Sequence, residues 1–271
     1  MDETQTAPVD LDRSDAGYLY FRNYFEVHTK AMARDAVQAR VEDLFHTLCH
    51  RVRPTIGIEI GAHEARFSSG LKQFSPETRC LAFEANPYVF EKHAERLTGL
   101  GVEYLPLAIG PTNGPVELVI PTSVRRRGRR LANRMASLRV HTAADSAETV
   151  EVESRRLDDF LDPGPDDRLV AWVDVEGANE IVLGSGPEVM ARTSLVYIEV
   201  ERTAMWEDQW LDVDVARYFA GLGFVPIARD TQRPQQYNVI FASAELAADP
   251  EVARLAVASY RDVPPRRRRK G

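Results

Sequence analysis

The fold is decided by the stretch 55-TIGIEIGAHEARFSSGLKQFSPETRCLAFEANPYVF-90. An apolar run from Thr55 to Ile60 has the length and composition of a buried strand, and it ends at Gly61. A helix-like segment follows, and a second apolar run, Arg79 to Phe83, ends at Glu84. This strand–helix–strand order predicts two parallel strands whose carboxyl ends meet at one edge of a sheet.

An acid marks the end of each strand, Glu59 in the first and Glu84 in the second. Ligands of parallel sheets bind outside the carboxyl strand ends, where Gly61 lets the backbone approach a ligand closely and Glu84 can accept hydrogen bonds from ribose hydroxyls. No G-x-G-x-x-G motif is present, because His63 and Ala65 stand where further glycines would. This pattern argues against a pyrophosphate and favours a ligand with a ribose but no phosphates, such as S-adenosylmethionine (SAM).

Strands and helices alternate along the rest of the chain, which predicts an α/β fold with a mostly parallel sheet and right-handed crossovers. The expected strands of this sheet span 55–60, 79–84, 102–109, 169–173, 194–200, 224–228 and 237–242. The last two are expected to close the sheet as an antiparallel pair. A further strand at 116–120 follows an Asn-Gly turn signal and is expected to pair with 149–153.

The regions outside this core have different compositions. Residues 1–17 are polar and are expected to be disordered, and 18–53 show helical spacing. The ligand-binding domain is expected over 54–250 with a long loop at 122–148, and 251–271 should form a helix and a basic tail. The helical segment indicates either a cap over the sheet edge or a substrate lid. The lid would carry Tyr18, Tyr20, Arg22, Glu26 and His28.

Composition narrows the class of protein. The 271 residues carry a net charge of -7, so the chain as a whole is not built to coat nucleic acid. Cys49 and Cys80 are the only cysteines, and they fit a reducing, cytoplasmic compartment. No apolar run approaches about 18 residues and the N-terminus lacks a signal-peptide pattern, so we expect no membrane span. A homodimer through the N-terminal helices stays open.

Seven arginines lie between Arg125 and Arg139. They indicate either a surface loop or an active-site loop that grips phosphate or carboxylate groups of an anionic substrate. Nucleic-acid binding is disfavoured, because no aromatic residues are interleaved for base stacking.

Four short motifs carry a family resemblance. They are Glu59–His63, Phe83–Pro87, Leu157–Phe160 and Val173–Gly177. In this order they are similar to acid-x-Gly-Ala-Asn, Phe-Glu-Pro-Asn-Pro, Leu-Asp-Asp and Ile-Asp-Val-Glu-Gly. With Ser137-Leu138 in the long loop, the chain resembles the FkbM-type SAM-dependent O-methyltransferases from about Thr55 to Ser243. The resemblance implies a class I, Rossmann-like methyltransferase fold.

The function implied by the resemblance is methyl transfer from SAM to a hydroxyl of a sugar, glycolipid, polysaccharide or other natural product. The partner would be a small-molecule or glycan acceptor and no nucleic acid. His63, Ala65, Ala85 and Asn179 depart from the family pattern. The alternative is therefore a catalytically degenerate SAM-binding module that acts as an assembly partner. A nucleic-acid methyltransferase is disfavoured, because the expected strand at 169–173 is not followed by an Asn-Pro-Pro-Tyr motif.

The candidate cofactor residues lie at the expected strand ends. They are Glu59, Gly61, Ala62, His63, Glu84, Ala85, Asn86, Ala108 and Asp174. For Glu84, a purely structural role as an acid ahead of the helix at Pro87 is the alternative.

Asp174 is the first candidate for the general base, because it follows the expected strand at 169–173 and a hydroxyl nucleophile needs a proton acceptor. Glu176, His63 and His141 are the other candidates. Asp174, Glu176 and Glu199 could also hold a divalent cation such as Mg²⁺. The structural alternative is that Asp174 and Glu176 cap the following helix.

Overall fold

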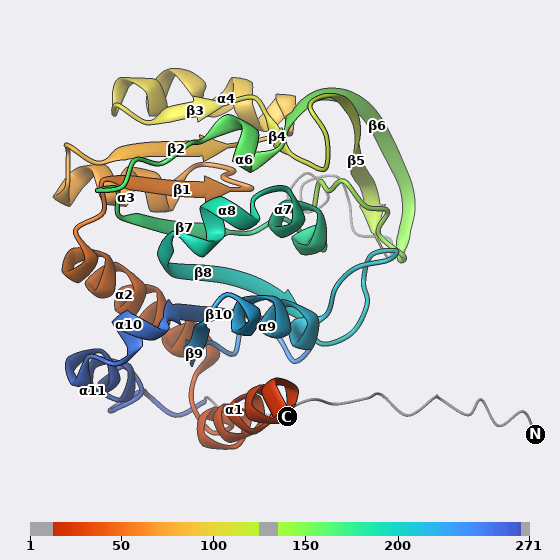
Figure 1. Ribbon diagram of the computed structural model, residues 1–271. Helices are drawn as coiled ribbons and strands as arrows, with labels where there is room; N and C mark the ends of the chain where they lie inside the picture. Colours follow the sequence, from red (N-terminus) through yellow and green to blue (C-terminus); the bar gives the residue numbers. More distant parts are fainter. Residues whose placement is uncertain (1–12, 125–134, 267–271) are drawn as a thin grey trace, which may run out of the picture.

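A computed structural model describes residues 13–124 and 135–266 (Figure 1). Its centre is a seven-stranded sheet of order β3-β2-β1-β7-β8-β10-β9. The strands are β1 (Ile56–Ile60), β2 (Arg79–Phe83), β3 (Glu103–Leu105), β7 (Leu169–Val173), β8 (Thr193–Glu201), β9 (Phe224–Arg229) and β10 (Gln236–Ser243). The first five strands of this order are parallel, and β10 runs antiparallel to β8 and β9. The predicted α/β sheet is confirmed.

Helices cover both faces of the sheet (Figure 1). They are α1 (Arg13–Thr29), α2 (Arg34–Val52), α3 (Arg66–Phe74), α4 (Pro87–Gly99), α6 (Leu157–Phe160), α7 (Asn179–Ser185), α8 (Pro187–Ala191), α9 (Asp212–Gly221), α10 (Ala244–Ala247) and α11 (Pro250–Ala258). Side chains of α7, α8 and α9 pack on one face, and side chains of α2, α3 and α11 pack on the other. The ends of the parallel strands lie between these two layers.

The pleat of β1 sends its side chains to both layers. Ile58 and Ile60 join the core with α7 and α9, whereas Gly57 and Glu59 face α3. A Cβ at Gly57 would lie 2.4 Å from Leu71 Cδ2, so the glycine allows α3 to pack directly on the strand. The sheet therefore brings Glu59 to the N-terminus of α3.

The expected strand at 102–109 is wrong in one respect, because the chain divides it between two sheets. Only β3 joins the central sheet, and β4 (Ala108–Ile109) pairs with β6 (Ala144–Arg155) in a second, three-stranded sheet. Pro106 lies between them and has no N–H for a ladder, and Leu107 N turns back to donate to Leu105 O at 2.9 Å.

The added hairpin is confirmed and is longer than predicted. β5 (Gly114–Val124) pairs with β6 as expected, and the structure shows that the pairing is antiparallel, with Val116 opposite Val152. Figure 1 shows the hairpin as a curved arm beyond the arrowheads of the central strands. The chain between the two strands then returns over 135–143, which we call the return segment, and Ser137 exchanges two backbone hydrogen bonds with Val119. The expected loop at 122–148 is therefore partly strand.

Helix α1 begins at Arg13, inside the stretch expected to be disordered. Asp15 explains this early start, because its buried carboxylate pairs with Arg217 at 2.9 Å. Such a contact with α9 leaves no local signal in the sequence. The expectations for residues 1–12, for the arginines between 125 and 134 and for the tail beyond Arg266 lie outside the described residues.

The five lid candidates on α1 do not line the ligand cavity described below. Tyr18 donates to or accepts from Tyr237 Oη at 2.9 Å, and Tyr237 donates to Asp212 at 2.5 Å. Arg22 forms an ion pair with the same Asp212 carboxylate at 3.0 Å. Helix α1 is thus held to β10 and α9 by a buried polar network, as in a cap.

Removing one hydroxyl from this network is expected to weaken the attachment of α1. Tyr18→Phe should lower the free energy of unfolding by about 1 kcal/mol, the usual value of one hydrogen bond. For a domain of this size the Tm should then fall by roughly 2–4 °C, measured by circular dichroism. Tyr20→Phe on the same helix is the control, since Tyr20 is 75% exposed. Equal melting temperatures for the two variants would contradict the network.

The described residues contain no helix with the length and apolar content needed to cross a membrane.

Candidate active site

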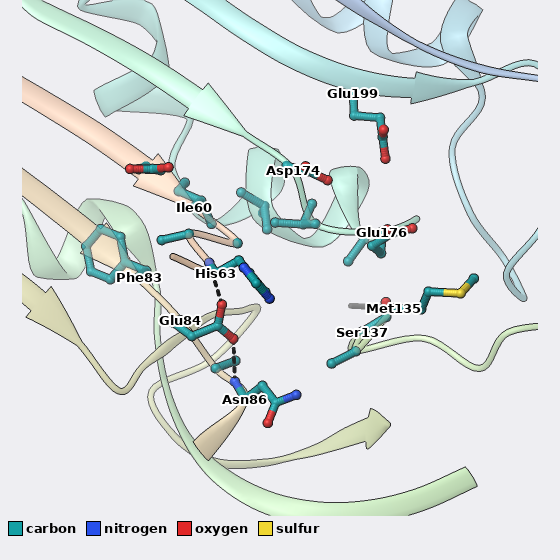
Figure 2. Close-up of a pocket in the computed structure, with 18 of the residues that line it drawn as sticks. Ile60, His63, Phe83, Glu84, Asn86, Met135, Ser137, Asp174, Glu176 and Glu199 are labelled. Atoms are coloured by element: carbon teal, nitrogen blue, oxygen red, sulfur yellow. Dashed lines mark hydrogen bonds between the residues drawn. The ribbon is translucent and has the colours of Figure 1, made fainter. Parts of the chain in front are cut away.

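A cavity of 450 Å³ opens at the carboxyl ends of β1, β2, β7 and β8. Its size suits a small organic ligand, for which pockets of roughly 300–1,000 Å³ are usual. Figure 2 shows Glu84 on one side and three further acids, Asp174, Glu176 and Glu199, together on the other. All nine residues predicted to bind the cofactor line this cavity: Glu59, Gly61, Ala62, His63, Glu84, Ala85, Asn86, Ala108 and Asp174.

Gly61 is required by a contact within the protein. Its φ of +75° is readily adopted by glycine, and a Cβ there would lie 1.8 Å from the backbone oxygen of Asp174. The backbone N–H of Asp174 in turn donates to Ile60 O at 2.9 Å. The sequence predicts that Gly61 lets a ligand approach the backbone. In the structure, the glycine is needed first of all because the ends of β1 and β7 approach each other closely. His63 and Ala65 also have positive φ values, 45° and 49°.

Glu84 holds the loop after β1. Its two carboxylate oxygens accept from the backbone N–H of His63 at 2.6 Å and of Asn86 at 2.7 Å (Figure 2). Asn86 is the N-cap of α4, so Glu84 also has a structural role at the N-terminus of this helix. Each oxygen keeps a free lone pair, so the same carboxylate can also accept from ribose hydroxyls. Burial raises the pKa of Glu84 to about 7.

Glu59 accepts hydrogen bonds from the N-terminus of α3. It accepts from Ser68 N at 2.8 Å and Phe67 N at 3.3 Å, and the N-cap residue Ala65 offers no side-chain cap. Burial raises the pKa of Glu59 to about 7. The carboxylate therefore holds the first turn of α3, the helix that follows the glycine loop.

The two histidine candidates lie in different places. His63 lines the cavity, and its carbonyl oxygen accepts from Tyr104 Oη at 2.5 Å. His141 does not line the cavity: its Nδ1 accepts from Ala143 N at 3.0 Å, and its ring packs against Trp206. The geometry therefore brings His63, and not His141, to the other candidate bases.

Asp174, Glu176 and Glu199 meet at the tips of β7 and β8. One carboxylate oxygen from each lies within 4.8 Å of the others. The N-cap of α7 is Ala178, which has no side-chain cap, so neither acid fills the capping role considered for it. Burial raises the pKa of Asp174 to about 6, and burial followed by mutual repulsion raises the pKa values of Glu176 and Glu199 well above the ordinary range.

A buried amide supports the acid cluster from behind. Gln236 Nε2 donates to Glu199 at 2.7 Å and to Glu201 at 3.4 Å, and its oxygen accepts from Arg233 Nη1 at 3.0 Å. These three hydrogen bonds fix which way Gln236 points, because a flipped amide would lose all of them. Glu199 is thus held toward the cavity.

Several lining residues were not predicted. They are Gln38, Glu42, Arg66, Met135, Ala136, Met205, Gln232, Arg233 and Gln236 among others. Gln38 and Glu42 lie four residues apart on α2 and share a hydrogen bond of 3.0 Å, so helical spacing indicated that they share a face. No signal in the sequence indicated that this face meets the cavity.

The charge of the lining indicates a cationic ligand. Among the residues that the structure describes, seven acids line the cavity, namely Glu42, Glu59, Glu64, Glu84, Asp174, Glu176 and Glu199, against the two arginines Arg66 and Arg233. Carboxylates desolvated this close together repel one another, and a positive charge among them relieves the repulsion. SAM carries a sulfonium and an ammonium group, so this donor set fits it.

Comparison with known families decides the assignment. The model of the methyltransferase FkbM domain matches residues 59–226. The chain belongs to the FkbM methyltransferase family. It is a SAM-dependent methyltransferase, and its matched region spans β1 to the start of β9.

Individual relatives of this FkbM methyltransferase are distant. It is 23% identical over 177 residues to the 2-O-methyltransferase NoeI of Sinorhizobium fredii, covering 60% of this chain and 70% of the relative. A solved FkbM methyltransferase from Methylobacillus flagellatus KT has 14% identity and a TM-score of 0.43, with 86% of this chain and 63% of that chain covered. Magnesium protoporphyrin IX methyltransferase from Synechocystis PCC 6803, solved with bound SAM, has 6% identity and a TM-score of 0.41 over 88% and 100% of the chains.

The raised carboxyl pKa values predict how stability and SAM binding depend on pH. Glu59 and Glu84 have pKa values of about 7 in the folded protein, whereas a glutamate in an unfolded chain titrates near about 4.3. Between these values the folded state keeps protons that the unfolded state has lost, so the SAM-free protein should lose stability as the pH rises. Affinity for cationic SAM should increase as the pH rises through about 7, where the two folded carboxyls lose their protons.

The measurement is the Tm from pH 5 to 8, with and without SAM. Stabilisation by SAM should be larger at pH 8 than at pH 6. Glu84→Gln removes one titrating group and should reduce the slope of Tm against pH. Identical slopes for the wild type and this variant would contradict the raised pKa of Glu84.

Proposed function

We propose that this FkbM methyltransferase transfers the methyl group of SAM to a hydroxyl oxygen of a sugar, glycolipid, polysaccharide or related natural product. The observation that carries the proposal is the position of Asp174, a carboxylate beside other acids in the same cavity as the cofactor residues. A hydroxyl is a poor nucleophile until a base removes its proton, and Asp174 can be that base. The relative whose name states a 2-O-methyltransferase supports oxygen as the target.

The chain's own residues have separate roles in this proposal. Glu84 accepts hydrogen bonds from the ribose hydroxyls, and the loop of Gly61 and Ala62 packs along the cofactor. Asp174 receives the hydroxyl proton on a carboxylate oxygen. Its pKa of about 6 leaves it ionised at neutral pH yet close enough to the working pH to be an effective base. Bound SAM supplies an electrophilic methyl group.

The test is methyl transfer from radiolabelled SAM to a panel of hydroxyl compounds, including methyl glycosides, glycolipids and polyketide alcohols. Label in an ether-linked methyl group is the expected result. Transfer only to amines or thiols would overturn hydroxyl specificity. Binding of SAM with no transfer to any member of the panel would favour the degenerate module.

A metal dependence would come from Asp174, Glu176 and Glu199, whose oxygens could bind a hard divalent cation. Under this version, activity should be lost in excess chelator and restored by Mg²⁺. The measurement compares initial rates in untreated, chelated and Mg²⁺-restored enzyme. Full activity in chelator would exclude the cation and leave Asp174 as a base without metal.

A further inference from the structure

Arg139 is set apart from its neighbours in the return segment by the direction of its side chain. Met135, Ala136, Ser137 and Leu138 line the cavity, and Figure 2 shows Met135 and Ser137 on the side opposite Glu84. Arg139 follows them directly but does not line the cavity. Its side chain is only 13% exposed, which is unusual for an arginine from a segment that the sequence indicates as a surface loop.

The guanidinium of Arg139 joins two other segments. Nη2 donates to Glu180 Oε2 at 2.7 Å, in the first turn of α7. Nη1 donates to the backbone oxygen of Glu207 at 3.0 Å, in the loop after β8. The main chain of Arg139 is also fixed, because its N–H donates to Ser137 Oγ at 3.0 Å. One planar cation thus connects three segments with directional, charge-assisted bonds.

The neighbouring backbone extends this connection. Thr142 N donates to Met205 O at 2.9 Å, and Glu207 N donates to Val140 O at 3.0 Å. Met205 and Trp206 line the same cavity. The return segment and the loop after β8 therefore form one continuous wall, and Arg139 attaches this wall to α7, the helix that follows the acids of β7.

We propose that Arg139 is a positioning residue for cofactor binding, which holds the wall of Ser137 and Leu138 against the start of α7. This role differs from the substrate-binding role considered for the arginine-rich loop, because Nη1 and Nη2 of Arg139 both donate to acceptors within the protein. The inference concerns the wall of the SAM site alone, so it holds for any acceptor.

The test measures the affinity of the demethylated product, S-adenosylhomocysteine, by isothermal titration, which needs no acceptor. Arg139→Met keeps the length of the side chain and removes the guanidinium, and it should weaken binding by about 10-fold, in the range of networks that act at a distance. Arg139→Lys keeps the charge but cannot reach Glu180 and Glu207 together. Its affinity should lie between those of the wild type and Arg139→Met. The control is Arg155→Met on β6, because Arg155 is half-exposed and its ion pair with Glu153 is long, at 3.8 Å.

Glu180→Ala gives an independent arm, because alanine removes both the charge and the acceptor oxygens. If Arg139 acts through Glu180, the double variant Arg139→Met/Glu180→Ala should bind little worse than Arg139→Met alone, because both changes break one interaction. Wild-type affinity in a folded Arg139→Met protein overturns the proposal. If that protein does not fold, wild-type affinity in both Arg139→Lys and Glu180→Ala overturns it instead. Failure of the wild type to bind would contradict the cofactor assignment itself.

Discussion

Asp174→Asn is expected to lower turnover by about 10²- to 10⁴-fold, the usual contribution of a general base. Asparagine has nearly the same shape, and the backbone bond from residue 174 to Ile60 O does not depend on the side chain. SAM affinity should therefore stay close to that of the wild type. Single-turnover rates and isothermal titration, measured on the same protein, separate the two quantities.

The pH dependence of the rate gives a second measure of the same assignment. The wild-type rate should fall on the acid side near pH 6, where Asp174 takes up a proton. Glu176→Gln is the matched control: it neutralises a neighbouring acid in the cluster and leaves Asp174 in place. Wild-type rates in Asp174→Asn, with the loss appearing in Glu176→Gln, would transfer the role of base to Glu176.

Glu84→Ala is expected to weaken SAM binding by about 1–3 kcal/mol, which corresponds to roughly 5- to 150-fold in the dissociation constant. Two losses combine in this value. The ribose hydroxyls lose a charged acceptor, and the backbone N–H groups of His63 and Asn86 lose the partner that holds the loop. Isothermal titration with SAM measures the change.

Glu117→Ala is the control for Glu84, because Glu117 is an exposed acid on β5 and changes the net charge equally. It should bind SAM as the wild type does. Glu84→Gln should be intermediate, since its amide keeps one acceptor oxygen but turns an NH₂ group toward a backbone N–H. Unchanged affinity in Glu84→Ala would refute the ribose assignment, whatever happens to the loop.

Much of the fold could be predicted because its signals are local. Apolar runs of strand length and the intervening helical periods identify β1, β2, β7 and β8 without any long-range information. The acids at the strand ends followed from the same reasoning, since parallel strands present their carboxyl ends at one edge. The failures have local or tertiary causes. Pro106 divides 102–109 between two sheets, and the ion pair of Asp15 extends α1 past the predicted start.

The sequence by itself determined the class of protein, the succession of strands along the chain and which acids stand at their ends. Only the tertiary structure decided that α2 lines the cavity and that Arg139 points away from it. It also decided that Gly61 is needed for the contact between two strand ends. The physical reason is that strand character arises from neighbours in sequence, whereas charge clusters, close backbone approaches and buried ion pairs arise between residues far apart in the chain, where packing alone sets the distances.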